Sequence, residues 1–218
     1  MFRLIAATGL LSLAGCASVA EPAYRVVLAE APFEVRAYQP MIVAETRIEG
    51  ERGAAANAGF RILADYIFGN NTAKAEIAMT APVTQAQDGQ EIAMTAPVMQ
   101  APAGSAWVVG FVMPAEWTLD TLPTPNDPRV VLRRQDGRHV AVVRFAGTTG
   151  EGAVRRETEA LERWLAAKGM TPAGAPVVAR YDPPWTLPMF RRNEIQIEIL
   201  QGSPAGRDQG SSASGTSR

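Results

Sequence analysis

Residues 76–83 read Glu76-Ile77-Ala78-Met79-Thr80-Ala81-Pro82-Val83, and the same eight residue types return at 91–98 as Glu91-Ile92-Ala93-Met94-Thr95-Ala96-Pro97-Val98. The segment between the two copies is polar and contains the turn-forming pair Asp88-Gly89. Each copy is therefore predicted to be a short apolar extended segment, and the two copies to be the strands of one hairpin. Pro82 and Pro97 lack an N–H group, which confines the ends of these segments to a sheet edge or to an exit from the sheet.

The repeated box resembles the I-A-M-T-A-P-V motif of the SOUL family of haem-binding proteins. The likeness runs from about Tyr24 to Leu200 and includes further motifs in the family's order: Phe33-Glu34-Val35-Arg36-Ala37-Tyr38, Gly59-Phe60, Tyr66-Ile67-Phe68-Gly69-Asn70-Asn71, Tyr181-Asp182-Pro183-Pro184-Trp185-Thr186-Leu187-Pro188 and Arg191-Arg192-Asn193-Glu194. The resemblance implies an α+β fold, in which a curved antiparallel sheet or distorted β-barrel carries two helices. It also implies a likeness to bacterial effector-binding domains and non-covalent binding of haem or a related tetrapyrrole.

The length of 218 residues suits one domain with a sizeable core, which we place at 24–200. The chain has 21 Lys and Arg against 22 Asp and Glu, a formal net charge of −1. This balance leaves no basic footprint for nucleic acid, so a nucleic-acid partner is not expected.

The first 15 residues carry one charge, Arg3, followed by an apolar run, which is typical of a secretion signal. Leu13-Ala14-Gly15-Cys16 resembles the lipobox of bacterial lipoproteins, which implies that Cys16 is lipidated and anchors the mature chain to a membrane. By resemblance, the expected location is the outer membrane facing the periplasm. An ordinary signal peptide with an incidental thiol is the alternative. Cys16 is the only cysteine, so disulfides are excluded. Residues 16–23 are expected to be a tether and residues 201–218 a disordered tail.

Periodicity predicts two helices, at 54–68 and 151–168, with Gly69-Asn70-Asn71 ending the first. Thr148 and Glu151 have the spacing of a capping box for the second helix. Strands are expected at 24–28, 33–38, 41–48, 106–113, 130–133, 139–145, 177–181 and 194–200.

Segments before the two helices match at an offset of 97 (133 − 36). The matching pairs are Arg36/Arg133, Val43/Val140, Ala44/Ala141, Arg47/Arg144 and Gly50/Gly147. We interpret the chain as a diverged duplication whose halves together form one curved antiparallel sheet covered by two helices. The groove between the halves is the expected ligand site.

Motifs for catalysis are absent from the sequence. It contains no zinc-ligand cluster, C-x-x-C-H haem attachment, G-x-G-x-x-G turn, P-loop or G-x-S-x-G elbow. We therefore expect no catalytic or metal site and do not expect an enzyme. Two alternatives stay open: an enzyme that modifies a tetrapyrrole through a carboxylate or tyrosine, and a module that binds an apolar small molecule or a partner peptide.

His139 is the only histidine, and on its predicted strand it alternates with Ala141 and Val143. A half-buried structural histidine is expected there rather than a haem ligand. The resemblance places the haem-ligand histidine of one family branch at the position of Ala37, so coordination from that position does not carry over.

The resemblance places a haem groove along the first helix and near the Asp-Pro-Pro loop. The site residues expected there are Phe60, Leu63, Ile67, Trp185, Met189, Phe190 and Arg191, with Arg61 and Arg192 as further partners for the propionates. The alternative is that Leu63 and Ile67 are core residues and the arginines are solvated. Met79 and Met94 are expected to fill the core rather than to bind iron. The predicted function is haem carriage or buffering by a lipid-anchored protein.

Overall fold

The computed structural model describes residues 19–73 and 89–200. The helices in these ranges are α1 (Arg52–Ile67), α2 (Glu151–Ala167) and the short 3₁₀ helix η1 (Pro188–Phe190). The strands are β1 (Tyr24–Glu30), β2 (Phe33–Tyr38), β3 (Met41–Glu49), β4 (Asn71–Thr72), β5 (Val98–Ala103), β6 (Ala106–Val112), β7 (Thr124–Pro125), β8 (Val131–Gln135), β9 (Arg138–Phe145), β10 (Val177–Arg180) and β11 (Asn193–Ile199).

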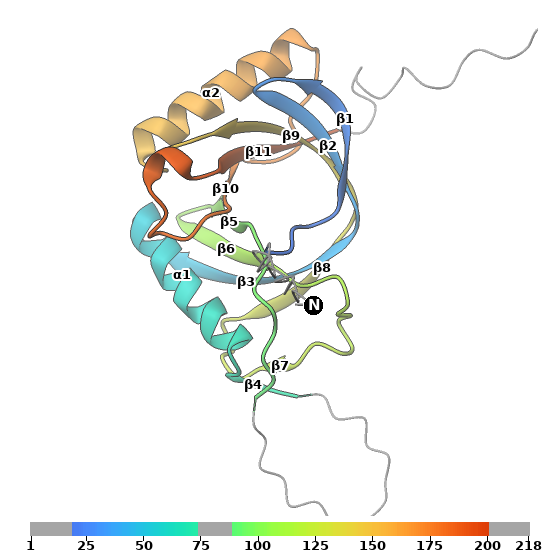
Figure 1. Cartoon of the computed structure of the whole chain (residues 1–218), viewed down its shortest axis with the longest axis vertical. Helices are drawn as coiled ribbons and strands as arrows, with labels where there is room; N and C mark the ends of the chain where they lie inside the picture. Colours follow the sequence, from blue (N-terminus) through green and yellow to red (C-terminus); the bar gives the residue numbers. More distant parts are fainter. Residues whose placement is uncertain (1–18, 74–88, 201–218) are drawn as a thin grey trace, which may run out of the picture.

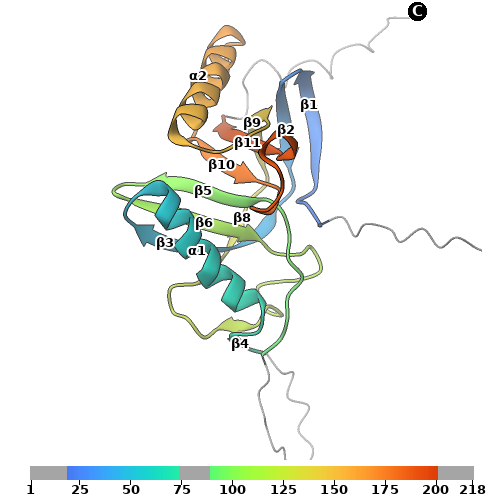
Figure 2. The same ribbon diagram turned by 60° about the vertical axis from the view of Figure 1, so that its left-hand side comes forward.

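Nine strands form one antiparallel sheet in the order β1-β2-β9-β11-β10-β5-β6-β3-β8, and β4 pairs with β7 separately. The sheet curls into a half-barrel with α1 and α2 on its outer side (Figure 1). Figure 2 shows the two helices one above the other against that outer side. The predicted class, a curved antiparallel sheet with two helices, is confirmed.

Outward from the central neighbours β10 and β5, the strands of the two halves of the sheet follow corresponding orders. β2, β9, β11 and β10 occupy the places that β8, β3, β6 and β5 occupy in the other half. β2 therefore pairs with β9, and β8 with β3, so each half completes the sheet of the other. This arrangement agrees with the offset of 97, while the duplication itself stays a prediction.

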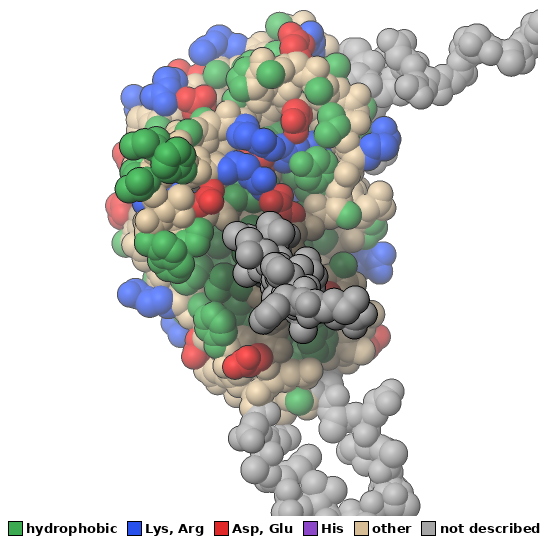
Figure 3. Space-filling model, viewed as in Figure 1, with side chains coloured by type: hydrophobic (Ala, Val, Ile, Leu, Met, Phe, Trp, Pro, Cys, Tyr) green, Lys and Arg blue, Asp and Glu red, His purple; other side chains and the backbone are tan. Residues whose placement is uncertain are grey.

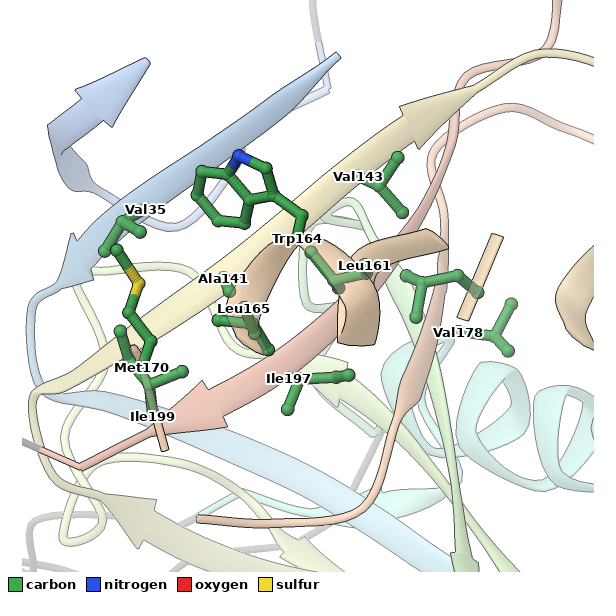
Figure 4. Close-up of a cluster of buried hydrophobic side chains, with 11 residues drawn as sticks. Val35, Ala141, Val143, Leu161, Trp164, Leu165, Met170, Val178, Ile197 and Ile199 are labelled. Atoms are coloured by element: carbon green, nitrogen blue, oxygen red, sulfur yellow. The ribbon is translucent and has the colours of Figure 1, made fainter. Parts of the chain in front are cut away.

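One core cluster lies between α2 and the sheet (Figure 4). Leu161 and Leu165, which lie four residues apart on one face of α2, are fully buried against strands β2, β9 and β11. Trp164 lies beside them, and its ring stacks on Phe33 with centroids 5.1 Å apart.

A second cluster lies between α1 and strands β3 and β6. Leu63, Tyr66 and Ile67 are buried there against residues such as Phe111. α1 approaches β6 so closely at Gly59 that an added Cβ would lie 2.6 Å from Val109 Cβ.

The second copy of the box is not a strand until Val98, so the hairpin prediction is wrong for this copy. Residues 91–97 run as irregular chain past the end of α1, where the Ile92 N–H donates to the Ile67 carbonyl at 2.8 Å. The Ile92 side chain enters the α1 cluster, and Thr95 makes an isolated bridge to Ala20. The first copy, 76–83, lies outside the described residues.

Two predicted segment ends also differ. The N-cap of α2 is Gly150, with no side-chain hydrogen bond, so the capping box of Thr148 and Glu151 does not form. The predicted tether packs on the domain from Ala20 onward, since the Ala23 carbonyl accepts a hydrogen bond from the Gln39 N–H. Residues 1–18, with the signal and Cys16, and the tail 201–218 lie outside the described residues.

Candidate functional site

The connection between β10 and β11 carries four large apolar side chains on the protein surface. Trp185 is 82 % exposed, Leu187 58 %, Met189 67 % and Phe190 71 %. We call these four side chains the loop surface. In Figure 3, hydrophobic side chains gather on the side of the molecule where η1 and α1 lie in Figure 1. Clustered exposed apolar side chains mark a binding surface on a folded protein.

The structure divides the predicted site residues into two groups. Trp185, Met189 and Phe190 lie on the loop surface, while Leu63 and Ile67 are 0 % and 1 % exposed in the α1 cluster. Helical periodicity puts Leu63 and Ile67 on one face, but that face packs on the sheet, so neither side chain is open to a ligand.

Other predicted residues of α1 and the box reach the surface. Phe60 is 36 % exposed, and its ring meets Phe111 edge-on with centroids 5.4 Å apart. Arg61 is exposed. Met94 is 40 % exposed and so does not fill the core as expected, and Met79 lies outside the described residues.

Arg191 stabilises the loop through hydrogen bonds to the loop's own carbonyl groups. Its Nε donates to the Thr186 carbonyl at 2.7 Å, and its Nη2 donates to the Pro184 carbonyl at 2.5 Å. The neighbouring Arg192 N–H donates to Asp182 Oδ2 at 2.6 Å. Arg191 therefore fixes the shape of the loop, a role that the sequence did not indicate, and its contact with a propionate stays a prediction.

Arg192 ties the loop to the N-terminal segment. Its guanidinium lies 3.5 Å from the centroid of the Tyr181 ring, and its Nη2 donates to Glu21 Oε2 at 2.5 Å. The Tyr181 N–H donates to the Arg192 carbonyl at 3.2 Å. The two ends of the loop are thus held together at Tyr181 and Arg192.

Beneath the loop lies a buried ionic network on the inner face of the half-barrel. Side chains alternate along β11, and Ile195 and Ile197 face α2, so Glu194 and Gln196 face inward. Glu194, 0 % exposed, accepts hydrogen bonds from Arg36 Nη1 at 2.9 Å and Nη2 at 3.1 Å. It also accepts from the Tyr181 hydroxyl at 2.7 Å and from Gln196 Nε2 at 3.0 Å.

This network fixes the charges of its members. Burial raises the pKa of Glu194, but hydrogen bonds and the charge of Arg36 outweigh burial and bring the pKa below its usual value. Burial, and then the Glu194 charge, raises the pKa of Tyr181 far above its usual value. Glu194 is therefore an ionised acceptor and Tyr181 a neutral donor, and together they anchor the start of the loop to β11.

Neither Leu187 as a surface residue nor this network was predicted from the sequence. Arg36 and Glu194 both fall in motifs that carry the family likeness, and both are charged residues within strands that otherwise alternate with apolar residues. A charge in such a strand needs a buried partner. The pairing across 158 residues, however, depends on β2 and β11 both flanking β9.

A separate cleft of about 670 Å³ lies among residues 20–23, 39–42 and 112–120. Its apolar lining includes Met41, Ile42, Val112, Met113 and Trp117, and Glu116, Asp120 and Arg134 are among its charged residues. This volume lies within the range of small-molecule pockets.

His139 lies at the far end of β9 from the loop. It pairs in register with Ile199, whereas Phe145, at the other end of β9, pairs with Asn193 beside the loop. At about 3.3 Å per residue, the two ends of β9 are roughly 20 Å apart. His139 is half-buried, as predicted, and its Nδ1 has no hydrogen-bond partner among the described residues. Across the strands it pairs with Ala37.

Within residues 19–73 and 89–200, no three His, Cys, Asp or Glu side chains are grouped so that they could hold a metal ion. In the same ranges, no helix is long and apolar enough to cross a membrane.

Solved structures with the same fold have low sequence identity to this chain. The EcmrR C-terminal domain is 12 % identical, with a TM-score of 0.55 over 81 % of this chain and 98 % of that one. A hydrolase from Listeria innocua is 11 % identical, with a TM-score of 0.50 over 77 % and 91 %. EcmrR in an EcmrR–DNA complex is 12 % identical, with a TM-score of 0.54 over 77 % and 56 %. At these identities the likeness shows the fold alone.

Among curated proteins, none matches this sequence. The model of one protein family, described as SOUL heme-binding protein, matches residues 19–198. The match extends from before β1 into β11 and includes the second box copy, both helices and the loop surface. The chain therefore belongs to the SOUL heme-binding protein family.

Proposed function

We propose that this protein binds haem or a related tetrapyrrole non-covalently on the loop surface, for carriage or buffering rather than catalysis. The observation that carries the proposal is the exposure of Trp185, Leu187, Met189 and Phe190 in a member of a haem-binding family. A porphyrin face is large, flat and apolar, and its burial is worth about 25 cal/mol per Å². Aromatic side chains suit such a face because they stack on it.

The bracing of the loop supports binding. Arg191 and Arg192 hold the loop's carbonyls and its two ends, and the Glu194 network fixes its base. A surface that is already ordered loses little conformational entropy when a ligand binds. The order of the loop therefore lowers the entropy cost of binding at the loop surface.

The apolar side chains of the loop surface fit the apolar face of a tetrapyrrole. Met189 supplies an exposed thioether on the loop surface, which is a ligand type for haem iron. When bound, the haem would supply a redox-active iron. His139, roughly 20 Å away along β9, does not serve this surface.

The strand pairing of His139 with Ala37 gives an alternative location for the same ligand. His139 lies directly across from Ala37, the position at which the family resemblance implies an axial histidine in one branch. Directly opposed residues on antiparallel strands have Cβ atoms about 5 Å apart. In this alternative, His139 would supply the iron ligand, and the loop surface would be free of haem.

Titration of the purified protein with haemin tests the proposal. We expect a saturable Soret shift at micromolar or tighter affinity. A response that is nonspecific and does not saturate would contradict it. Chromatography of haemin incubated with the protein should return haemin unchanged, and a new product would indicate an enzyme instead.

The cleft favours a second function, a module that binds an apolar small molecule. Its volume of about 670 Å³ and its lining by Met41, Val112 and Trp117 suit such a ligand. An apolar dye bound in the cleft would separate the two functions. In our proposal, haemin leaves this dye in place, whereas displacement by unrelated apolar compounds would favour the second function.

We also propose that lipidation of Cys16 anchors the protein at the outer membrane, facing the periplasm. The lipobox-like Leu13-Ala14-Gly15-Cys16 supports this. Ala20 already contacts the domain, so such an anchor would leave only a short span of chain between domain and membrane. Cys16→Ala should move the protein from the membrane to the soluble fraction, and an unchanged membrane fraction would contradict the anchor.

A further inference from the structure

The loop surface lies on a stretch of chain without charged residues. It reads Pro183-Pro184-Trp185-Thr186-Leu187-Pro188-Met189-Phe190, and the first charged residues on either side are Asp182 and Arg191. Both of these side chains are hydrogen-bonded within the protein, Asp182 to the Arg192 N–H and Arg191 to two carbonyl groups of the loop. The stretch can therefore enter an apolar medium without taking an unpaired charge with it.

The backbone of this stretch is also largely hydrogen-bonded within the protein. Its three prolines have no N–H group that needs a partner. Five of its eight carbonyl groups accept hydrogen bonds from the protein, namely those of Pro183, Pro184, Thr186, Leu187 and Pro188. The hydrocarbon part of a bilayer offers no partners to backbone groups, so a segment that enters it must supply them itself. The loop meets this condition at most of its carbonyl groups.

The start of the described chain is attached to the base of the same loop. Glu21 Oε2 accepts a hydrogen bond from Arg192 Nη2 at 2.5 Å, and Ala20 forms a bridge to Thr95. Cys16, the proposed lipid anchor, precedes Ala20 by four residues. Four residues span roughly 14 Å even when fully extended. A chain anchored at Cys16 therefore holds the base of the loop close to the bilayer surface.

We propose that the loop surface inserts its apolar side chains into the lipid bilayer to which the protein is anchored, at the boundary between headgroups and acyl chains. Tryptophan is favoured at this depth because its ring is apolar and its indole N–H is polar. Leu187, Met189 and Phe190, each more than half exposed, add apolar area beside Trp185. The formal net charge of −1 gives no general attraction to anionic lipid, so the contact depends on apolar burial.

Lipid and haem would cover the same four side chains, so they occupy the loop surface in turn. The inference rests on the proposed Cys16 anchor for the position of the loop, and it does not rest on haem binding. Its test therefore contains no haemin, and the haemin titration contains no vesicles. Failure of one proposal leaves the other measurable.

Vesicles of phosphatidylcholine with brominated acyl chains are the probe, because bromine quenches tryptophan fluorescence only on contact. The full chain is mixed with these vesicles, and with unbrominated vesicles as the reference. The chain has four tryptophans, so the difference between the protein and Trp185→Phe gives the signal of Trp185 alone. We expect brominated lipid to quench Trp185 at least twofold. Flotation of the protein with the vesicles reports on the anchor, and an unquenched Trp185 would overturn the proposal whether or not the protein floats.

The composition of the vesicles tests the apolar character of the contact. Because the inserted stretch is uncharged, the quenching should be equal in phosphatidylcholine and in anionic phosphatidylglycerol, and salt should not reduce it. Quenching that requires anionic lipid and disappears at high salt would indicate headgroup binding and overturn insertion.

Two double variants of matched size test whether the contact belongs to the loop surface. Leu187→Ser with Phe190→Ser should lower the quenching of Trp185 by more than half. Val131→Ser with Phe68→Ser removes side chains that are 52 % and 61 % exposed outside the loop surface, and should leave the quenching unchanged. Equal losses in the two double variants would show nonspecific adhesion and overturn the proposal.

Discussion

Replacing Trp185 by alanine removes the largest exposed side chain of the loop surface. Trp185 is 82 % exposed, and a tryptophan that becomes buried covers up to about 250 Å². If a porphyrin covers one face of the ring, about 100 Å² are buried, worth about 2.5 kcal/mol at 25 cal/mol per Å². We therefore expect the haemin Kd of Trp185→Ala to rise roughly 50- to 100-fold. The melting temperature should not change, because an exposed side chain contributes little to the core.

Two further variants make the result specific. Val131→Ala removes an apolar side chain that is 52 % exposed on the edge strand β8 and should leave haemin affinity unchanged. Leu63→Ala should destabilise the fold by about 2–5 kcal/mol, because Leu63 is fully buried, without changing the haemin affinity of the folded protein. Soret titration gives the Kd, and circular dichroism gives the melting temperature. Wild-type affinity in Trp185→Ala, with an unchanged melting temperature, would refute this reasoning.

Three further predictions concern the network, the α1 contact and the iron ligand. Glu194→Gln leaves the buried Arg36 charge paired only with the partly exposed Glu34 carboxylate and should reduce the free energy of unfolding in urea by about 3 kcal/mol; a loss below about 1 kcal/mol would contradict a tightly paired network. Because the folded-state pKa of Glu194 lies below the usual 4.5, its stabilisation is complete above that pH and is lost as pH falls through the folded pKa; acid unfolding of Glu194→Gln should lack this component. Gly59→Ala should destabilise the protein by about 1 kcal/mol, since its Cβ would overlap Val109 despite a better helix propensity, and a rise in melting temperature would show that α1 can move away. His139→Ala should keep the haemin Kd within about twofold, because the mutation does not change the apolar surface that haemin buries at the loop surface, worth about 25 cal/mol per Å². Loss of the Soret shift would make His139 the axial ligand.

The regular elements could be predicted because their signals are local. The apolar periodicity of α2 and the alternation of β2, β3 and β9 each depend on neighbours within a few residues, and their predicted bounds agree with the observed ones to within one residue. The strand prediction for the second box copy failed because it, too, depended on local signals. Its apolar extended pattern fits both a strand and an irregular segment. The chain is irregular here because the Ile92 N–H donates to the Ile67 carbonyl and the Ile92 side chain packs in the α1 cluster.

The candidate site was predictable in part. The Asp-Pro-Pro-Trp motif indicated the loop that exposes Trp185 and Phe190. Periodicity could not show whether Leu63 faces a ligand or the sheet, because both surroundings select the same apolar residue types. Nor could it show that Arg191 donates to carbonyls of its own loop, because those contacts depend on how the chain turns between β10 and β11.

The position of the bound tetrapyrrole tests the central claim most directly. Ferric haemin broadens the NMR signals of nearby amides, so spectra of the isotope-labelled protein, recorded with haemin and with diamagnetic zinc protoporphyrin, locate the iron. We expect broadening centred on residues 182–190 and extending to Phe60. Broadening centred on Ala37 and His139, or on the cleft around Val112 and Trp117, would contradict the account.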